Sequence, residues 1–172
     1  MNGNVEQAVL ITGVYGSGKS SVAQEMAHLL EGQNAPYALL DLDFLGWFDA
    51  KDRSTWHGMM LKNVAALVDN YLAAGVRFFV LAGSLRDKAE IDAIETELPM
   101  PLKVIRLTVP LEEIEKRLRP DVTTGRREDL REAARWLAGS IGVGIEDKTV
   151  SNDRPIREVA SDILDWLGWH GA

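Results

Sequence analysis

The sequence predicts a three-layer α/β fold, in which helices cover both faces of a parallel sheet. Three observations lead to this prediction. Apolar runs of strand length alternate with helical patterns from end to end of the 172 residues. Each run is almost wholly apolar, which is typical of strands buried on both faces of a parallel sheet. No stretch rich in Gly, Ser and Pro interrupts the alternation, so we expect one domain spanning residues 1–172.

The first three elements fall within residues 8–42. Residues 8–12 (AVLIT) are apolar, rich in β-branched side chains and followed by Gly13, which predicts a strand. After a glycine-rich turn, apolar residues at helical spacing predict a helix that ends near Gly32: Ala23, Met26, Ala27 and Leu30. Residues 37–42 (YALLDL) predict the second strand.

The middle of the chain repeats this order. A helical stripe that ends at Gly75 consists of Leu61, Val64, Ala65, Val68, Tyr71 and Leu72. Residues 76–82 (VRFFVLA) predict the third strand, and residues 86–96 predict a weaker helix.

The last third supplies two more strands. Residues 102–109 (LKVIRLTV) predict the fourth strand, and Pro110 stands where a helix can begin, with Leu111, Ile114 and Leu118 on its inner face. Apolar residues between 130 and 141 predict the next helix, residues 148–151 a short fifth strand, and residues 156–167, after Pro155, the last helix.

Composition excludes several classes of protein. The chain has no cysteine, which excludes disulfides, thiolate metal sites and a cysteine nucleophile. Its formal net charge of −7 disfavours nucleic acid as a partner. No secretory signal or membrane-spanning run is visible, so we expect a cytoplasmic protein without a membrane partner. The sequence does not indicate the oligomeric state.

The turn after the first strand carries the most specific motif. Residues 13–20 (GVYGSGKS) match the phosphate-loop pattern GxxxxGK[ST], or Walker A motif, between a predicted strand and a predicted helix. Backbone amides of such a loop face a polyphosphate, Lys19 reaches its β and γ phosphates, and Ser20 offers a hydroxyl to Mg²⁺. The nucleotide-binding residues expected here are Gly13, Val14, Tyr15, Gly16, Ser17, Gly18, Lys19, Ser20 and Ser21.

With this motif, the chain resembles the P-loop kinases of the nucleoside-monophosphate-kinase-like group, which includes shikimate, gluconate and adenylylsulfate kinases. The likeness spans nearly the whole chain, although only the phosphate loop is a specific motif. It implies a five-stranded parallel sheet in the order 2-3-1-4-5, a mobile lid, Mg²⁺ and ATP as donor, and a small acceptor beside the second strand.

Two carboxylates close the second strand. Period-two alternation predicts that Asp41 and Asp43 lie on the same side of the chain. The resemblance implies that Asp41 holds Mg²⁺ through water and that Asp43 orients or deprotonates the acceptor hydroxyl. The aromatic and apolar residues that follow, including Trp47, either line an acceptor pocket or belong to the core. Arg53 and His57 are further candidates for contact with an anionic acceptor.

The third strand ends in small residues, Ala82-Gly83-Ser84, without the aspartate that motor ATPases and GTPases place there. This disfavours a hydrolase of that type. In the kinases that the chain resembles, small residues here leave room for substrate. Arg86 is a candidate for binding an acidic group of the acceptor, and the alternative is a surface arginine at the start of a helix.

Residues 116–135 hold seven basic and four acidic side chains, a net charge of +3. By resemblance, residues 117–130 form a lid whose arginines contact adenine and phosphates, for which the planar guanidinium is suited. Arg117 and Arg119 compete for the adenine role, and Arg126 and Arg127 for the catalytic contact with phosphate. The alternative is a charged helix pair with exposed ion pairs.

The turn at residues 151–155 (SNDRP) corresponds to the place where related kinases wrap backbone around the adenine edge. Asn152 and Arg154 are therefore candidate nucleotide-binding residues, although such turns are common between a strand and a helix.

Together these features predict an ATP-dependent phosphotransferase acting on a hydroxyl of a small molecule, with Lys19, Asp43 and the lid arginines as its catalytic residues. Two alternatives remain open: a nucleotide-regulated accessory NTPase without such an acceptor, and a kinase of nucleotides. The sequence does not identify the acceptor.

Overall fold

A five-stranded parallel sheet forms the centre of the molecule. The computed structural model describes residues 6–49, 52, 55–118 and 124–169, and for residues 124–126 it describes only the backbone. The strands are β1 (Gln7–Thr12), β2 (Tyr37–Asp41), β3 (Phe78–Ala82), β4 (Leu102–Thr108) and β5 (Lys148–Ser151). They are arranged in the order β2-β3-β1-β4-β5, and every neighbouring pair is parallel. The strand order implied by the resemblance is thus confirmed.

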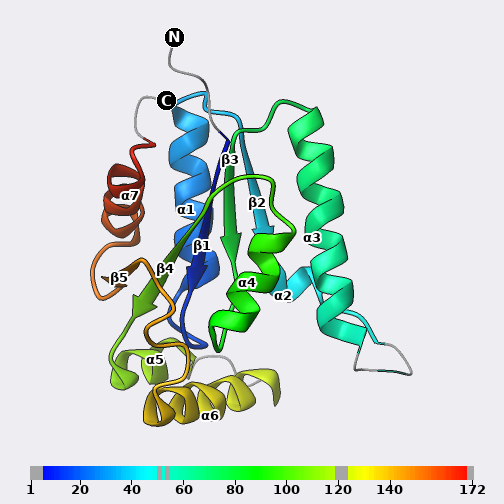
Figure 1. Ribbon diagram of the computed structural model, residues 1–172. Helices are drawn as coiled ribbons and strands as arrows, with labels where there is room; N and C mark the ends of the chain where they lie inside the picture. The colour runs from blue at the N-terminus through cyan, green and yellow to red at the C-terminus, as the bar shows by residue number, and fades with distance from the viewer. Residues whose placement is uncertain (1–5, 50–51, 53–54, 119–123, 170–172) are drawn as a thin grey trace.

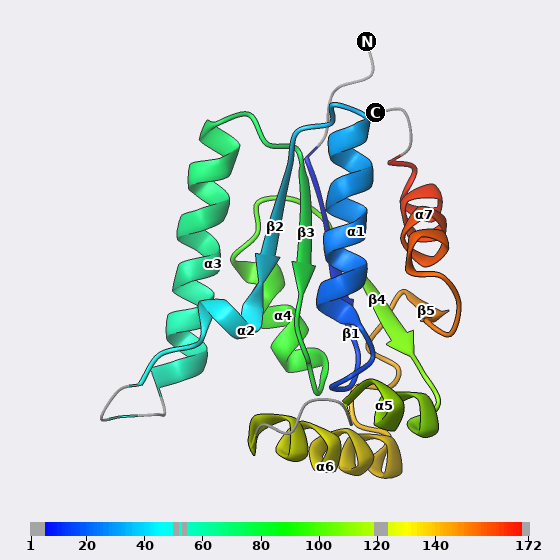
Figure 2. The ribbon, with the colours of Figure 1, turned by 180° about the vertical axis from the view of Figure 1, so that it is seen from behind.

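Helices cover both faces of this sheet (Figures 1 and 2). On one face α1 (Lys19–Gly32) and α7 (Ile156–Leu167) bury their apolar stripes against Val9 and Ile11 of β1. On the other face α3 (Trp56–Ala73) and α4 (Lys88–Thr96) pack against Ala8 and Leu10 of the same strand. Alternate residues of β1 therefore serve two separate cores, which explains why the strand is apolar throughout.

Two further helices lie across the carboxyl ends of the strands. In Figures 1 and 2, α5 (Leu111–Leu118) and α6 (Thr124–Gly139) lie beyond the arrowheads of β1 and β4. A third apolar cluster joins them to the turn after β1 and includes Val14, Ile114, Leu118, Ala133 and Trp136. This cluster fixes α5 and α6 over the edge of the sheet where parallel α/β folds bind their ligands.

The sequence prediction was wrong at the end of the second strand. β2 ends at Asp41, and Leu42–Leu45 form a short helix, α2, for which the Asp41 side chain accepts a hydrogen bond from the backbone amide of Asp43. Leu42 is buried with the α3 face of the core, so the chain turns inward one residue before the predicted strand end.

The remaining boundaries differ by a few residues, as is usual at element ends. Trp169 is fully buried against Phe78, with 4.9 Å between ring centroids, and so belongs to the core just after the last helix. Among the described residues, no helix is both long and apolar enough to cross a membrane.

Candidate active site

The phosphate loop joins β1 to α1 and depends on glycine at two close contacts. Gly16 has φ of 78° and Gly18 has φ of 92°, which is the left-handed region that other residues rarely adopt. A Cβ at Gly16 would lie 2.8 Å from a methyl carbon of Ile114, and a Cβ at Gly18 would lie 2.5 Å from Nδ2 of Asn152. The glycines therefore let the loop lie directly against α5 and against the turn after β5.

Lys19 is buried at the start of α1, with only 7% of its surface exposed. Its Nζ donates a hydrogen bond of 3.1 Å to the carbonyl oxygen of Val14 and lies 5.3 Å from the centroid of the Tyr15 ring. Burial lowers the pKa of this ammonium to about 8, although the charges of Asp43, Asp41 and Asp129 oppose the shift. The lysine is thus held inside the loop by one carbonyl, and its positive charge is poorly solvated.

The loop has the features that phosphate binding requires. Gly18 is the N-cap of helix α1, and no side chain accepts a hydrogen bond from the amides of its first turn. These amides are therefore available to a ligand. The hydroxyl of Ser17 is buried and has no hydrogen-bond partner among the described residues. Together with the undersolvated Lys19, these groups fit the phosphates of a nucleotide.

Ser20 and Asp41 come together at the mouth of this loop. The Ser20 hydroxyl donates a hydrogen bond of 2.8 Å to Oδ2 of Asp41, while Oδ1 of Asp41 accepts the amide of Asp43 at 3.0 Å. A hydroxyl and a carboxylate are hard oxygen donors of the kind that Mg²⁺ prefers. The two residues that the resemblance implies for Mg²⁺ thus lie side by side, and their donor set fits this ion.

Asp43 lies beside this pair, but not for the predicted reason. The prediction of strand alternation was wrong because Asp43 belongs to α2. Burial raises the pKa of its carboxyl, the charges of Asp41 and Asp129 raise it further, and Lys19 lowers it. The Asp43 side chain is exposed to solvent at the edge of the site and is close enough to Lys19 for the two charges to interact.

Arg117 and Asn152 meet beneath the loop. The Nδ2 of Asn152 donates a hydrogen bond of 2.7 Å to the carbonyl of Ser17, and Arg117 donates to the same carbonyl at 3.5 Å and to the carbonyl of Asn152 at 2.7 Å. Asn152 is 3% exposed. The turn after β5 is thus fastened to the phosphate loop. Arg154 instead pairs with Asp162 of α7 at 2.5 Å.

Helix α6 lies in the segment for which the resemblance implies a lid, and it places an aromatic side chain and carboxylates beside Tyr15. Its Trp136 is buried, meets the Tyr15 ring edge-on with 6.4 Å between centroids, and donates from Nε1 to Glu132 at 3.0 Å. Burial raises the pKa of Tyr15, and the charges of Asp43, Asp129 and Glu132 raise it further. This basic segment therefore turns carboxylates toward the site, which its net charge did not indicate.

The predicted lid arginines are only partly visible. Arg119 and the side chain of Arg126 lie outside the described residues, and Arg127 is exposed on α6. Arg117, for which the resemblance implies a contact with adenine, donates hydrogen bonds to the carbonyls of Ser17 and Asn152.

The predicted acceptor residues differ in their surroundings. Trp47 is 78% exposed and stacks on Phe44, which is 68% exposed, with 5.7 Å between ring centroids, so the core interpretation is wrong for this pair. Arg86 is exposed after β3, and its charge lowers the pKa of Tyr15 against the stronger effect of burial. Arg53 lies outside the described residues, and His57 is half-buried in the first turn of α3.

The small residue after β3 has a packing role. A Cβ at Gly83 would lie 2.8 Å from a methyl carbon of Leu42, so the absence of a side chain admits the start of α2. The space that we expected for substrate is thus occupied at Gly83 by the chain itself.

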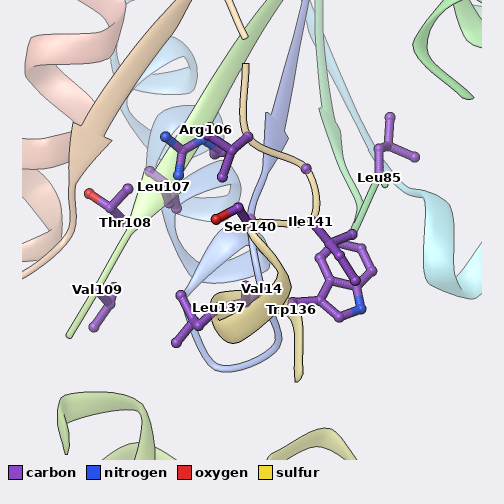
Figure 3. Close-up of a pocket in the computed structure, with 13 residues that line it drawn as sticks. Val14, Leu85, Arg106, Leu107, Thr108, Val109, Trp136, Leu137, Ser140 and Ile141 are labelled. Atoms are coloured by element: carbon purple, nitrogen blue, oxygen red, sulfur yellow. The ribbon is translucent and has the colours of Figure 1, made fainter. Parts of the chain in front are cut away.

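A separate cavity of about 90 Å³ lies behind the phosphate loop. Figure 3 shows its wall formed by Val14, by Leu107 of β4 and Val109 just after it, and by Trp136 of α6 and Ile141 just beyond that helix. Gly13 and Val14 of the phosphate loop line it, whereas Lys19, Ser20, Asp41 and Asp43 do not, so the cavity adjoins the loop but lies away from the candidate catalytic groups.

Comparison with known proteins supports the fold. No family model and no curated protein matches the chain. Among solved structures, an unliganded sugar kinase from Janibacter sp. HTCC2649 is 19% identical, with a TM-score of 0.69 over 96% of each chain. The adenylylsulfate (APS) kinase of Mycobacterium tuberculosis, in complex with AMPPNP and APS, is 22% identical, with a TM-score of 0.62 over 95% of this chain and 98% of the other. The shikimate kinase of Acinetobacter baumannii, in complex with shikimate, is 16% identical, with a TM-score of 0.59 over 96% of this chain and 95% of the other. The chain has the fold of the P-loop small-molecule kinases.

Proposed function

We propose that the protein is an ATP-dependent phosphotransferase that moves the γ-phosphoryl group of ATP to a hydroxyl of a small-molecule acceptor. One observation carries the proposal: a phosphate loop with a buried Lys19 lies beside the hydrogen-bonded pair Ser20–Asp41, with Asp43 next to it. Groups suited to bind a nucleotide, a cation and an acceptor proton thus adjoin one another at the carboxyl edge of the sheet, which supports the proposal. The kinases of the same fold agree with this reaction class.

In the proposed reaction the acceptor oxygen forms a bond to the γ-phosphorus as the bond to the β–γ bridging oxygen breaks, and ADP leaves. Lys19 and the amides at the start of α1 hold the β and γ phosphates. Ser20 and Asp41 would hold Mg²⁺, which supplies charge stabilisation to the phosphates when bound. The carboxylate of Asp43 takes the hydroxyl proton, and its raised pKa strengthens it as a base.

Asn152 and Arg117 support this site from below. Both bind the carbonyl of Ser17, so they fix the loop in the conformation in which its amides face a ligand. We further propose that helix α6 covers the nucleotide and excludes water from it.

A screen for acceptor-dependent release of ADP from Mg-ATP tests the function. Sugars, polyols, nucleosides, hydroxy acids and antibiotics form the panel. A compound that serves as acceptor is expected to raise the rate of ADP release well above the rate measured without it. Lys19→Ala should abolish that increase while the far-UV circular dichroism spectrum stays unchanged. Full transfer by Lys19→Ala would refute the site. Stimulation by a macromolecule in place of every small hydroxyl compound would favour the accessory-NTPase alternative.

A further inference from the structure

Exposed aromatic side chains gather beside the candidate base. Phe44 and Trp47 stack with 22° between their ring planes, and Phe48 and Trp56 are also exposed in part. The Trp56 ring lies against Gly46, where a Cβ would come within 2.7 Å of it, so the turn after α2 is covered by an indole. Large apolar side chains exposed together in this way mark a binding surface more often than an ordinary solvated one.

The stacked pair is placed to meet a molecule whose hydroxyl reaches Asp43. Phe44 follows Asp43 directly, and Trp47 lies three residues after Phe44, just beyond the end of α2, where its backbone amide donates a hydrogen bond to the carbonyl of Phe44. These two exposed rings are therefore the aromatic groups that lie nearest along the chain to Asp43, within reach of an acceptor whose hydroxyl faces it. Because a flat apolar ring stacks on such faces, the pair selects for acceptors that carry one.

Within the part of the chain that the structure describes, the charges acting on Asp43 and Tyr15 are mostly negative. Asp41 and Asp129 act on Asp43, and Asp129 and Glu132 act on Tyr15 from the side of α6. Lys19 is committed to the phosphates in the proposed reaction, and Arg135 neutralises part of the charge of Glu132 at 3.2 Å. Arg86 opposes the negative charges near Tyr15. Asp41 is likewise committed to Mg²⁺ in the proposed reaction, so the carboxylates that would repel an acceptor with a carboxylate or phosphate of its own are Asp43 and Asp129.

We propose that the acceptor is an uncharged or amine-bearing alcohol with an aromatic or other flat apolar ring, and that this ring lies on the Phe44–Trp47 pair while the hydroxyl faces Asp43. The inference rests on the proposed function for the role of Asp43, but it concerns binding and is tested by binding. It restricts the charge and the shape of the acceptor and does not identify a single compound.

Three glucosides separate the two requirements. Phenyl β-glucopyranoside has the ring and no charge, methyl β-glucopyranoside lacks the ring, and phenyl β-glucuronide has the ring with a carboxylate. Their affinities are measured by calorimetry with Mg-AMPPNP present, so no turnover is needed. We expect the phenyl glucoside to bind at least about tenfold more tightly than either of the others.

Variants then assign the effect to the pair. The double variant Phe44→Ala/Trp47→Ala should remove the advantage of the phenyl group, and because both side chains are exposed the fold should survive. Trp166→Ala is the matched control. Trp166 is also an exposed tryptophan, but it belongs to α7, which covers the opposite face of the sheet. It should leave the preference unchanged.

The outcomes separate this inference from the proposed function. Equal or tighter binding of the glucuronide, a phenyl preference that survives the double variant, or no binding of any probe at millimolar concentration would overturn the inference. Phosphorylation confined to anionic acceptors would overturn it while leaving the phosphotransferase intact. The predicted binding pattern without ADP release from any compound of the acceptor panel would support the inference and refute the function.

Discussion

Replacing Lys19 by methionine tests the electrostatics of the empty phosphate loop. Burial holds the pKa of Lys19 at about 8, against an ordinary value of 10.5. Between these two values the unfolded chain binds a proton that the folded chain has released. The free energy of unfolding therefore rises with pH across this window, and Lys19 destabilises the fold most below it.

The size of the effect follows from the shift. A fall of the pKa from 10.5 to about 8 corresponds to about 3 kcal/mol between the lower and upper ends of the window. Methionine has a similar apolar stem without the charge, so Lys19→Met lacks this dependence on pH. The loss of the hydrogen bond to Val14 shifts the whole curve of the variant but adds no slope of its own.

Urea unfolding followed by far-UV circular dichroism at pH 7, 8, 9 and 10 measures the effect. As the pH rises from 7 to 10, the free energy of unfolding of the wild type should increase relative to that of Lys19→Met by most of the difference of about 3 kcal/mol. Burial and neighbouring carboxylates raise the pKa of Tyr15 in both proteins, so this contribution cancels in the comparison with Lys19→Met. Lys62→Met, at an exposed position of α3, is the control for loss of a lysine. Parallel curves for wild type and Lys19→Met would refute a desolvated ammonium in the loop.

Three further predictions concern the nucleotide and the base. Binding of ATP at pH 8 should take up about half a proton through Lys19, because phosphates restore its charge; calorimetry in buffers of different ionisation enthalpy measures this, and equal enthalpies in all of them would contradict it. Asp43→Asn should lower kcat about 10²–10⁴-fold and remove the acidic limb of the pH–rate profile, and an unaltered profile would mean that another group is the base. Asn152→Ala should lower the free energy of unfolding by about 1–3 kcal/mol, because the buried carbonyl of Ser17 loses its 2.7 Å partner, and should also raise the KM for ATP. If only stability changes, Asn152 does not position the loop for nucleotide.

The parts of the site that are local in sequence could be predicted. The phosphate loop is a contiguous motif whose glycines, lysine and serine act through backbone geometry and neighbouring charge, so its sequence contains most of its chemistry. The apolar periodicities likewise predicted the strands and helices, because each element buries its own face. The strand order came only from the resemblance, since no local pattern states which strands become neighbours.

The contacts between distant segments could not be predicted. The carbonyl of Ser17 meets Asn152 across 135 positions of sequence, and only the fold brings the two together. The helix α2 was missed for a similar reason. Leu42 looks like the next strand residue, but burial against α3 favours a turn there, and Asp41 then caps the helix.

The acidic side of α6 could have been predicted from the spacing of its residues, although the net charge of the segment pointed the other way. The segment 116–135 has a net charge of +3, yet a net charge does not tell which face of a helix turns inward. Asp129, Ala133 and Trp136 are spaced as i, i+4 and i+7, so they share one face, and the burial of Ala133 and Trp136 fixes that face against the loop. The carboxylate of Asp129 is carried toward Lys19 and Asp43 by the packing of its neighbours. A basic helix therefore gives the acceptor side of the site an acidic wall, and this wall is the reason to expect an uncharged or cationic acceptor.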